Sequence, residues 1–307
     1  MAAGGGTKAI IAALLANAGI AVAKFIGYLV TGSSSMLAEG VHSVADTSNQ
    51  ALLLLGQKRA RREATQEHPF GYGRDRYFYS FVVALLLFSL GSVFALYEGF
   101  HKLESHEPLT SPIVAVVILV VAIVLETFSF RTAIRESRPL KGDGTWWQFI
   151  RQAKTPELPV VLLEDAGALF GLILALGGVG MTVLTGDPVW DAIGTLCIGA
   201  LLGVIAVILI VETKSLLIGE GSGPAELRTI RAVLVGDGVD RVIHVKTQYL
   251  GPDELLVAAK IAVPASMSTE QVAQAIDEAE GRVRAAVPPA RIIYLEPDLD
   301  RTPAATG

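Results

Sequence analysis

The chain has 307 residues, of which 51% are hydrophobic and only 18% are charged, against about 25% charged residues in ordinary soluble domains. Together with a mean hydropathy of +0.51, this composition excludes a typical soluble protein and indicates a membrane protein. The single cysteine, Cys197, excludes a disulfide framework within the chain. The formal net charge of −5 is unevenly spread, and no nucleic-acid partner is expected. Residues 1–8 carry one cation and no small-residue cleavage site, so a signal peptide is not expected there.

Apolar segments long enough to cross the hydrocarbon of a bilayer recur along the first two thirds of the chain. Crossing about 30 Å takes roughly 20 helical residues. The sequence predicts six such helices, over residues 8–31, 35–57, 78–102, 112–134, 158–183 and 188–217. Residues 32–35 predict a tight turn, and residues 186–188 break the chain between the last two helices.

Basic residues are distributed asymmetrically over the connections between these helices. They crowd the connections after the second and fourth helices: Lys58, Arg59, Arg61, Arg62, Arg74 and Arg76, then Arg131, Arg135, Arg138, Lys141, Arg151 and Lys154. The opposite connections hold almost none, apart from Lys102. Because short connections rich in Lys and Arg stay on the cytoplasmic side, we expect both termini to be cytoplasmic, in a multi-pass protein of the cell (inner) membrane.

The composition changes to that of a soluble domain near Gly219, so the expected domains are residues 1–218 and 219–307. In the second domain the pattern predicts a helix at 225–235, strands at 239–250, 255–263 and 292–295, and a helix to residue 286 with Ser268 as its N-cap. The order α-β-β-α-β is ferredoxin-like. The predicted fold class is therefore a membrane all-α six-helix transmembrane domain plus a small α+β (αββαβ, ferredoxin-like) cytoplasmic C-terminal domain.

Ionisable residues inside the predicted membrane helices are the most informative feature of the sequence. They are Glu39, His42 and Asp46 in the second helix, Glu126 in the fourth, and Glu164 with Asp165 in the fifth. Placing such a residue at bilayer depth costs roughly 2.5–3.5 kcal/mol on insertion scales. Residues three and four apart share one face of a helix, so the second helix carries a stripe of acid, imidazole and acid. These groups indicate binding of a metal ion or of protons.

The donor types narrow the choice of metal. His42, Asp46 and Asp165 offer one nitrogen and two carboxylates, with Glu164 or water as a fourth ligand, a set that suits tetrahedral Zn²⁺. An oxygen-only set would favour harder ions such as Mn²⁺, whereas one imidazole also suits Fe²⁺ and Co²⁺, so these three ions remain alternatives. Imidazole and carboxyl groups must lose protons to bind metal. Metal and protons can therefore be exchanged at one site, and no resident cofactor is required.

Four further polar residues have two interpretations each. Glu39 is either part of a proton path or a side chain that extends outward from the helix end. Glu126 either accepts protons or makes a packing hydrogen bond, and Asn49 either supports the site or bridges two helices. His68 either guides metal into the protein or belongs to an interfacial anchor with its aromatic neighbours.

Two stretches of the sequence resemble the cation diffusion facilitator family. The run Leu37-Ala38-Glu39-Gly40-Val41-His42-Ser43-Val44-Ala45-Asp46 is similar to its second helix, and His68-Pro69-Phe70-Gly71-Tyr72-Gly73-Arg74 is similar to the segment that follows. The resemblance implies a homodimeric antiporter that exports a divalent transition metal, usually zinc, against protons by alternating access. It also implies that His42, Asp46 and Asp165 belong to the transport site.

The chain departs from the family pattern at two places. Val161 stands where most members carry His or Asp, and Glu164 beside Asp165 is similar to the subgroup that contains a mitochondrial-type zinc exporter of animals. In the C-terminal domain, other residue types stand where metal-sensing members carry mostly His or Asp: Ile243, Lys260, Tyr294 and Glu296. The resemblance then implies a dimer contact without metal.

Two other functions remain open from the sequence. One is a structural or regulatory membrane protein that has lost transport, because Val161 interrupts the usual set of four ligands. The other is a metal-dependent intramembrane enzyme with His42 as a ligand and Glu39 or Glu164 as a base. The sequence contains no His-Glu-x-x-His run that would favour such an enzyme.

Overall fold

The computed structural model of the protein describes residues 3–105 and 111–299. The chain divides into two compact units. The first comprises residues up to Lys58 together with Arg76–Lys214, and the second comprises Arg59–Asp75 together with the residues from Ser215 onward. The second unit thus includes a connection between two helices that the predicted boundary at residue 218 assigns to the transmembrane domain.

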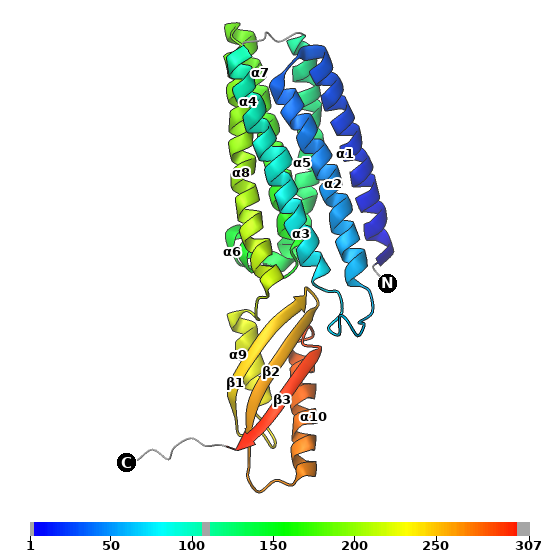
Figure 1. Ribbon diagram of the computed structural model, residues 1–307, viewed down its shortest axis with the longest axis vertical. Coiled ribbons are helices and arrows are strands. Elements are labelled where there is room, and N and C mark those ends of the chain that lie inside the picture. The colour runs from blue at the N-terminus through cyan, green and yellow to red at the C-terminus, as the bar shows by residue number, and fades with distance from the viewer. Residues whose placement is uncertain (1–2, 106–110, 300–307) are drawn as a thin grey trace, which may run out of the picture. The chain divides into compact units, whose positions relative to one another are not determined.

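Six long helical segments dominate the described part of the first 218 residues (Figure 1). They are α1 (Ala3–Thr31), α2 (Ser34–Ala60), the segment Asp75–Ser105, α5 (Pro112–Lys141), α7 (Glu157–Thr185) and α8 (Val189–Ile218). All six predicted helices are therefore present. Five of them are longer than expected, and α8 has the expected length but is shifted by one residue. A short helix, α6 (Trp146–Gln152), lies in the connection between α5 and α7.

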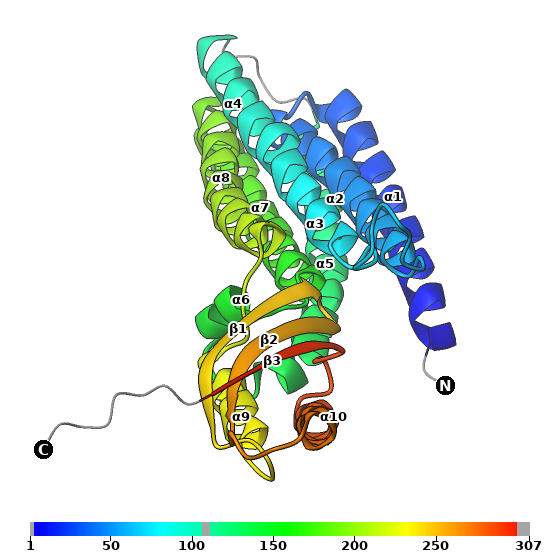
Figure 2. The same ribbon diagram turned by 60° about the horizontal axis from the view of Figure 1, so that its bottom comes forward.

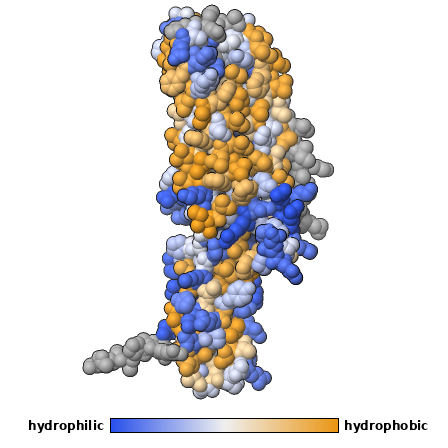
Figure 3. Space-filling view, in the orientation of Figure 1, coloured by the Kyte–Doolittle hydropathy of each residue, from blue (hydrophilic) through white to orange (hydrophobic). Residues whose placement is uncertain are grey.

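Length and composition fit a membrane protein. Within the described residues, the third to sixth of these segments are long and apolar enough to cross a membrane, and α1 contributes the shorter apolar stretch Ala18–Thr31. Large apolar side chains face outward, as at Leu29, Ile113 and Leu184, and Figure 3 shows hydrophobic residues over the surface of this unit. Helices satisfy their own backbone polar groups, which a bilayer requires.

The third segment is not the continuous α-helix that the sequence predicts. It consists of α3 (Asp75–Leu86), the π-helical stretch η1 (Leu87–Val93) and α4 (Phe94–Ser105). A Cβ atom at Gly91 would lie 3.2 Å from Leu202 Cδ1 and 3.8 Å from His42 Nδ1, so this stretch packs closely against α8 and α2. Such π-helical turns are rare and occur often at functional sites.

The second unit contains a three-stranded sheet with two helices. The order along the chain is α9 (Pro224–Leu234), β1 (Arg241–Gly251), β2 (Glu254–Val263), α10 (Thr269–Ala286) and β3 (Ile292–Leu299), which confirms the predicted α-β-β-α-β order. The strands lie in the order β1-β2-β3, with β1 antiparallel and β3 parallel to β2. The third strand extends beyond the predicted residue 295 because its pairing with β2 continues to Leu299.

The two helices lie side by side against the sheet (Figure 2). Ile230 and Val283 are fully buried against Val257 and Ile261 of the central strand. The helix α10 begins with the predicted N-cap, because the Ser268 hydroxyl accepts a hydrogen bond from the backbone N–H of Gln271 and the Gln271 side chain accepts one from the backbone N–H of Ser268.

Candidate metal centre

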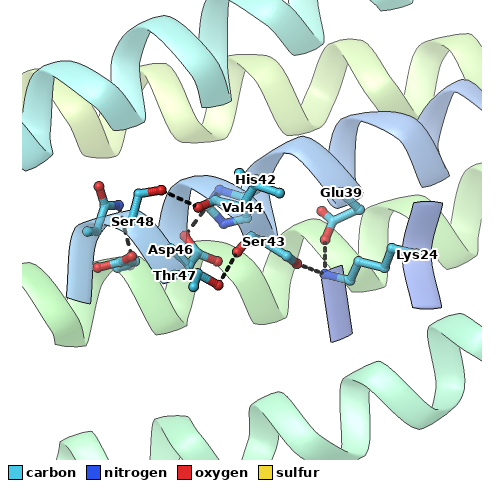
Figure 4. A network of polar contacts seen from close by, with 10 residues as sticks. Lys24, Glu39, His42, Ser43, Val44, Asp46, Thr47 and Ser48 are labelled. Carbon is cyan, nitrogen blue, oxygen red and sulfur yellow. Dashed lines mark hydrogen bonds and ion pairs between the residues drawn. The ribbon is translucent and has the colours of Figure 1, made fainter. Parts of the chain in front are cut away.

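His42 is the most informative residue of the helical unit. Its side chain is buried, and neither ring nitrogen has a hydrogen-bond partner among the described residues. Its Nδ1 lies 3.5 Å from Oδ1 of Asp46, the residue four positions further along α2 (Figure 4). Buried polar atoms are normally hydrogen-bonded, and each exception calls for an explanation. An imidazole with unused nitrogens beside a carboxylate suits a metal ion.

The helix α7 brings two carboxyl groups to the same region. Asn49 donates a hydrogen bond to Glu164 Oε1 at 3.0 Å, and Ser129 of α5 donates one to Asp165 Oδ2 at 3.0 Å. The side chains of Asp46 and Glu164 lie within hydrogen-bonding reach of each other. Residues of α2, α5 and α7 therefore converge here, and Asn49 bridges two helices as one of its two interpretations states.

The four predicted ligands are only partly assembled. His42, Asp46 and Glu164 are linked as a chain of contacts, whereas Asp165 bonds to Ser129 and faces a cavity. Among the described residues, no group of three or more His, Cys, Asp or Glu side chains is already arranged to hold a metal ion. Binding through all four residues requires side-chain movement, so the complete ligand set stays a prediction.

A cavity of about 320 Å³ leads to this region from one end of the helical unit. It lies between α2, α5 and α7 and extends from Asp165 to Glu157 at the beginning of α7. Its lining combines apolar side chains with polar ones, which include Gln50, Gln57, Ser129, Thr132, Glu136 and Ser137. Gln50 Oε1 and Ser137 Oγ are buried and have no hydrogen-bond partner within residues 3–105 and 111–299, which makes the cavity suited to water and hydrated ions.

A buried ion pair lies along α2 on the other side of His42. Lys24 of α1 and Glu39 are both fully buried, and Lys24 Nζ lies 3.0 Å from Glu39 Oε2. The interpretation of Glu39 as an outward-pointing side chain is therefore wrong. Lys24 is the residue that sequence reasoning missed, although a lysine within an apolar stretch is itself a visible signal.

The remaining candidates are placed differently. Glu126 of α5 is buried, within electrostatic range of Lys24 and Asp165, and its role in accepting protons stays a prediction. His68 belongs to the second unit and is exposed, with its ring centroid 4.7 Å from that of Tyr72. A role for His68 in metal entry is untested by these contacts.

In the sheet of the second unit, Lys260 forms ion pairs with two acidic residues. Lys260 of β2 pairs with Glu296 of β3 at 3.1 Å and with Asp298 at 3.0 Å. Hydrogen bonds to Asp298 and Glu296 raise the pKa of the Lys260 ammonium, so the group stays charged. The two carboxylates are thus already paired, which leaves less negative charge for a metal ion.

Comparison with known proteins gives a consistent result. A family model for the cation efflux transmembrane domain matches residues 10–218. The chain is 34% identical over 257 residues to the mitochondrial proton-coupled zinc antiporter SLC30A9 of Xenopus laevis, covering 83% of this chain and 46% of that protein. It is 31% identical over 257 residues to the Homo sapiens protein of the same name, covering 83% of this chain and 45% of that protein.

A plant protein shows similar coverage. Metal tolerance protein C4 of Arabidopsis thaliana is 31% identical over 259 residues, covering 83% of this chain and 56% of that protein. The chain therefore spans about half the length of these curated relatives. The family model covers well over half of the chain. Taken with the buried imidazole and carboxyl groups, the match identifies the chain as a multi-pass membrane protein of the cation diffusion facilitator (cation efflux) family.

Proposed function

We propose that this chain exports a divalent transition metal, with zinc as the main substrate, in exchange for protons by alternating access. Membership of a cation efflux family makes it a metal cation transporter rather than an enzyme. The observation that carries the proposal is the buried His42 ring, whose two nitrogens lack hydrogen-bond partners in the described part of the chain, beside Asp46. Relatives named as proton-coupled zinc antiporters support the choice of zinc and protons.

The contact between Asp46 and Glu164 supports proton coupling. An ionised carboxylate only accepts hydrogen bonds, so one of two carboxyl groups within hydrogen-bonding reach must carry a proton for a bond to form between them. A metal ion that takes oxygen atoms from both residues displaces this proton. Each metal ion that binds then releases a proton, and protonation of the site releases the metal ion.

The cavity supplies the loading route in this proposal. It opens at the end of the helical unit where α7 begins, next to the basic connection that precedes α7. Basic connections stay on the cytoplasmic side of a membrane. In this proposal the protein lies in the cell (inner) membrane, and the cavity and both termini face the cytoplasm. We propose that the transporter is a homodimer and that the second unit provides a contact without metal.

A transport-deficient regulator is the second candidate, because the four predicted ligands are not fully assembled among the described residues. Zinc uptake into proteoliposomes separates the two. The test compares Zn²⁺, Mn²⁺, Fe²⁺ and Co²⁺, with and without a pH gradient, and follows internal pH with a dye. We expect zinc uptake that the pH gradient accelerates, with protons moving the opposite way.

Matched variants show whether the flux runs through the candidate centre. Asp46→Ala should lower zinc uptake by about 100-fold or more, because it removes a ligand and not merely a supporting contact. Ser48→Ala is the control, since Ser48 is exposed on the same helix and donates its hydroxyl to the Val44 carbonyl of that helix. Absence of flux of all four metals in folded wild-type protein would favour the regulator.

A further inference from the structure

The buried pair of Lys24 and Glu39 links α1 to α2. Lys24 Nζ donates to Glu39 Oε2 at 3.0 Å and to Ser43 Oγ at 2.8 Å, and all three side chains are buried (Figure 4). A charge at bilayer depth is costly unless it is paired. The two residues therefore hold each other in place, and each depends on the other.

The same carboxylate also contacts α7. A Cβ atom built on Gly171 would lie 2.6 Å from Glu39 Oε1, so the Glu39 carboxylate would have to shift to admit a side chain at this position. This oxygen is buried and has no hydrogen-bond partner within the residues that the structure describes. Glu39 thus fills the space between α2 and α7, and Lys24 fixes it from α1.

The contact between Glu39 and Gly171 and the cavity lie on opposite sides of the candidate metal centre. Gly171 follows Asp165 by six residues, about 9 Å along a helix that rises 1.5 Å per residue. The cavity contacts α7 from Glu157 to Asp165, so along this helix it lies before Asp165, whereas Gly171 lies after it. On α2, likewise, Glu39 precedes His42, whereas the cavity begins at Gln50. The candidate metal centre lies between the cavity and the ion pair.

We infer that the Lys24–Glu39 pair, packed on Gly171, is the gate that closes the metal centre on the side opposite the cavity. This inference rests on the proposed transport function. Metal that enters through the cavity meets the closed pair, and release on the far side requires Glu39 to separate from Lys24 and move away from α7. Lys24 and Glu39 act as positioning residues.

The test uses a substitution that adds a side chain beside Glu39 and changes no charged residue. Gly171→Ala places a methyl group against Glu39 Oε1 and should force the pair apart. Gly177→Ala is the matched control on the same helix, because a Cβ atom there would meet no atom within 4 Å. Full-length variants are reconstituted in proteoliposomes, and both downhill zinc flux and protons moved per zinc are measured. Zinc affinity is measured separately by calorimetry.

If the pair is the gate, Gly171→Ala should raise downhill zinc flux by about tenfold and lower the protons moved per zinc, because a small shift between closed and open states changes the open population strongly. Its zinc affinity should stay within about threefold of wild type, and Gly177→Ala should behave as wild type in every assay. A purely structural role for the pair would instead lower binding and flux together. That result, or a Gly171→Ala protein with wild-type flux and coupling, would overturn the gate.

A second variant guards against misfolding of the first. Lys24→Met combined with Glu39→Gln removes both charges, leaves no buried charge without its partner and keeps the side-chain lengths similar. It should show the same loss of coupling with zinc affinity retained. Wild-type protein that moves zinc against protons while both variants do the same refutes the gate alone, whereas wild-type protein that moves no zinc refutes the proposed function.

Discussion

Glu164 of α7 contacts the residues of α2 in the candidate metal centre. One of its oxygens accepts a hydrogen bond from Asn49, and its side chain lies within reach of Asp46 on the neighbouring helix. Asp165, the next residue, points instead to Ser129 and the cavity. Val161 lines the same cavity without a donor atom, so Glu164 is the residue available to complete the ligand set.

The variant Glu164→Gln tests this assignment. Glutamine keeps the oxygen that accepts from Asn49 but removes the negative charge that a metal ion requires. We expect the zinc dissociation constant of the full-length protein to rise about 10- to 100-fold, with little change in Tm. Calorimetry on purified protein measures the constant, with Asp187→Asn in the exposed turn after α7 as the control. An unchanged constant would assign the fourth position to water.

The helical elements are held together by polar contacts that hydropathy does not show. Arg76 at the start of α3 forms a bidentate ion pair with Glu157 at the start of α7. Its Nε lies 2.5 Å from Oε1, and its Nη2 lies 3.1 Å from Oε2. Glu157 also lines the mouth of the cavity. The pair therefore compensates a carboxylate that would otherwise remain unpaired at a largely buried position.

Breaking this contact should destabilise the bundle. We expect Arg76→Gln to lower the free energy of unfolding by about 2 kcal/mol, the scale of hydrogen bonds to a charged group. The double variant Arg76→Gln with Glu157→Gln should recover part of the loss, because no buried charge is left without a partner. Thermal unfolding of the solubilised protein measures both. Equal Tm values for wild type and Arg76→Gln would show that the pair contributes nothing.

At the level of the whole molecule, hydrophobic pattern predicts the architecture well. The six helices, the α-β-β-α-β order and the Ser268 cap follow from periodicity and capping residues, which act locally along the chain. The π-helical stretch around Gly91 does not, because it depends on packing against Leu202 of α8. The pairing of Lys24 with Glu39 also depends on how two helices meet, and a single sequence does not contain that information.

In the second unit, too, contacts between segments that lie far apart in the sequence could not be predicted. Its elements are predictable, but not the inclusion of residues 59–75, in which Gly73 packs on the β1–β2 turn so closely that a Cβ atom would lie 2.7 Å from the Leu250 carbonyl oxygen. The lysine at position 260 predicts a sheet without metal, and the structure adds that Glu296 and Asp298 of β3 pair with this lysine.

Zinc stoichiometry of the whole chain tests whether the second unit binds metal. We expect the full-length double variant Asp46→Ala with Asp165→Asn to retain no tightly bound zinc, because the Lys260 ammonium already occupies the acidic groups of the sheet. Metal analysis of the purified protein after zinc loading and dialysis provides the measurement, with wild type as the reference. Zinc retained in proportion to chains would locate a second site outside the helical unit.

The central claim is that a metal ion and protons compete for the same buried groups on α2 and α7. Calorimetric zinc titrations of the full-length protein, repeated in buffers of different ionisation enthalpy, count the protons released per metal bound. Wild-type protein should release at least about one proton per zinc, because zinc would displace the proton that Asp46 and Glu164 are proposed to share. Tight zinc binding without proton release, or unchanged binding and release in Asp46→Ala, would contradict the account.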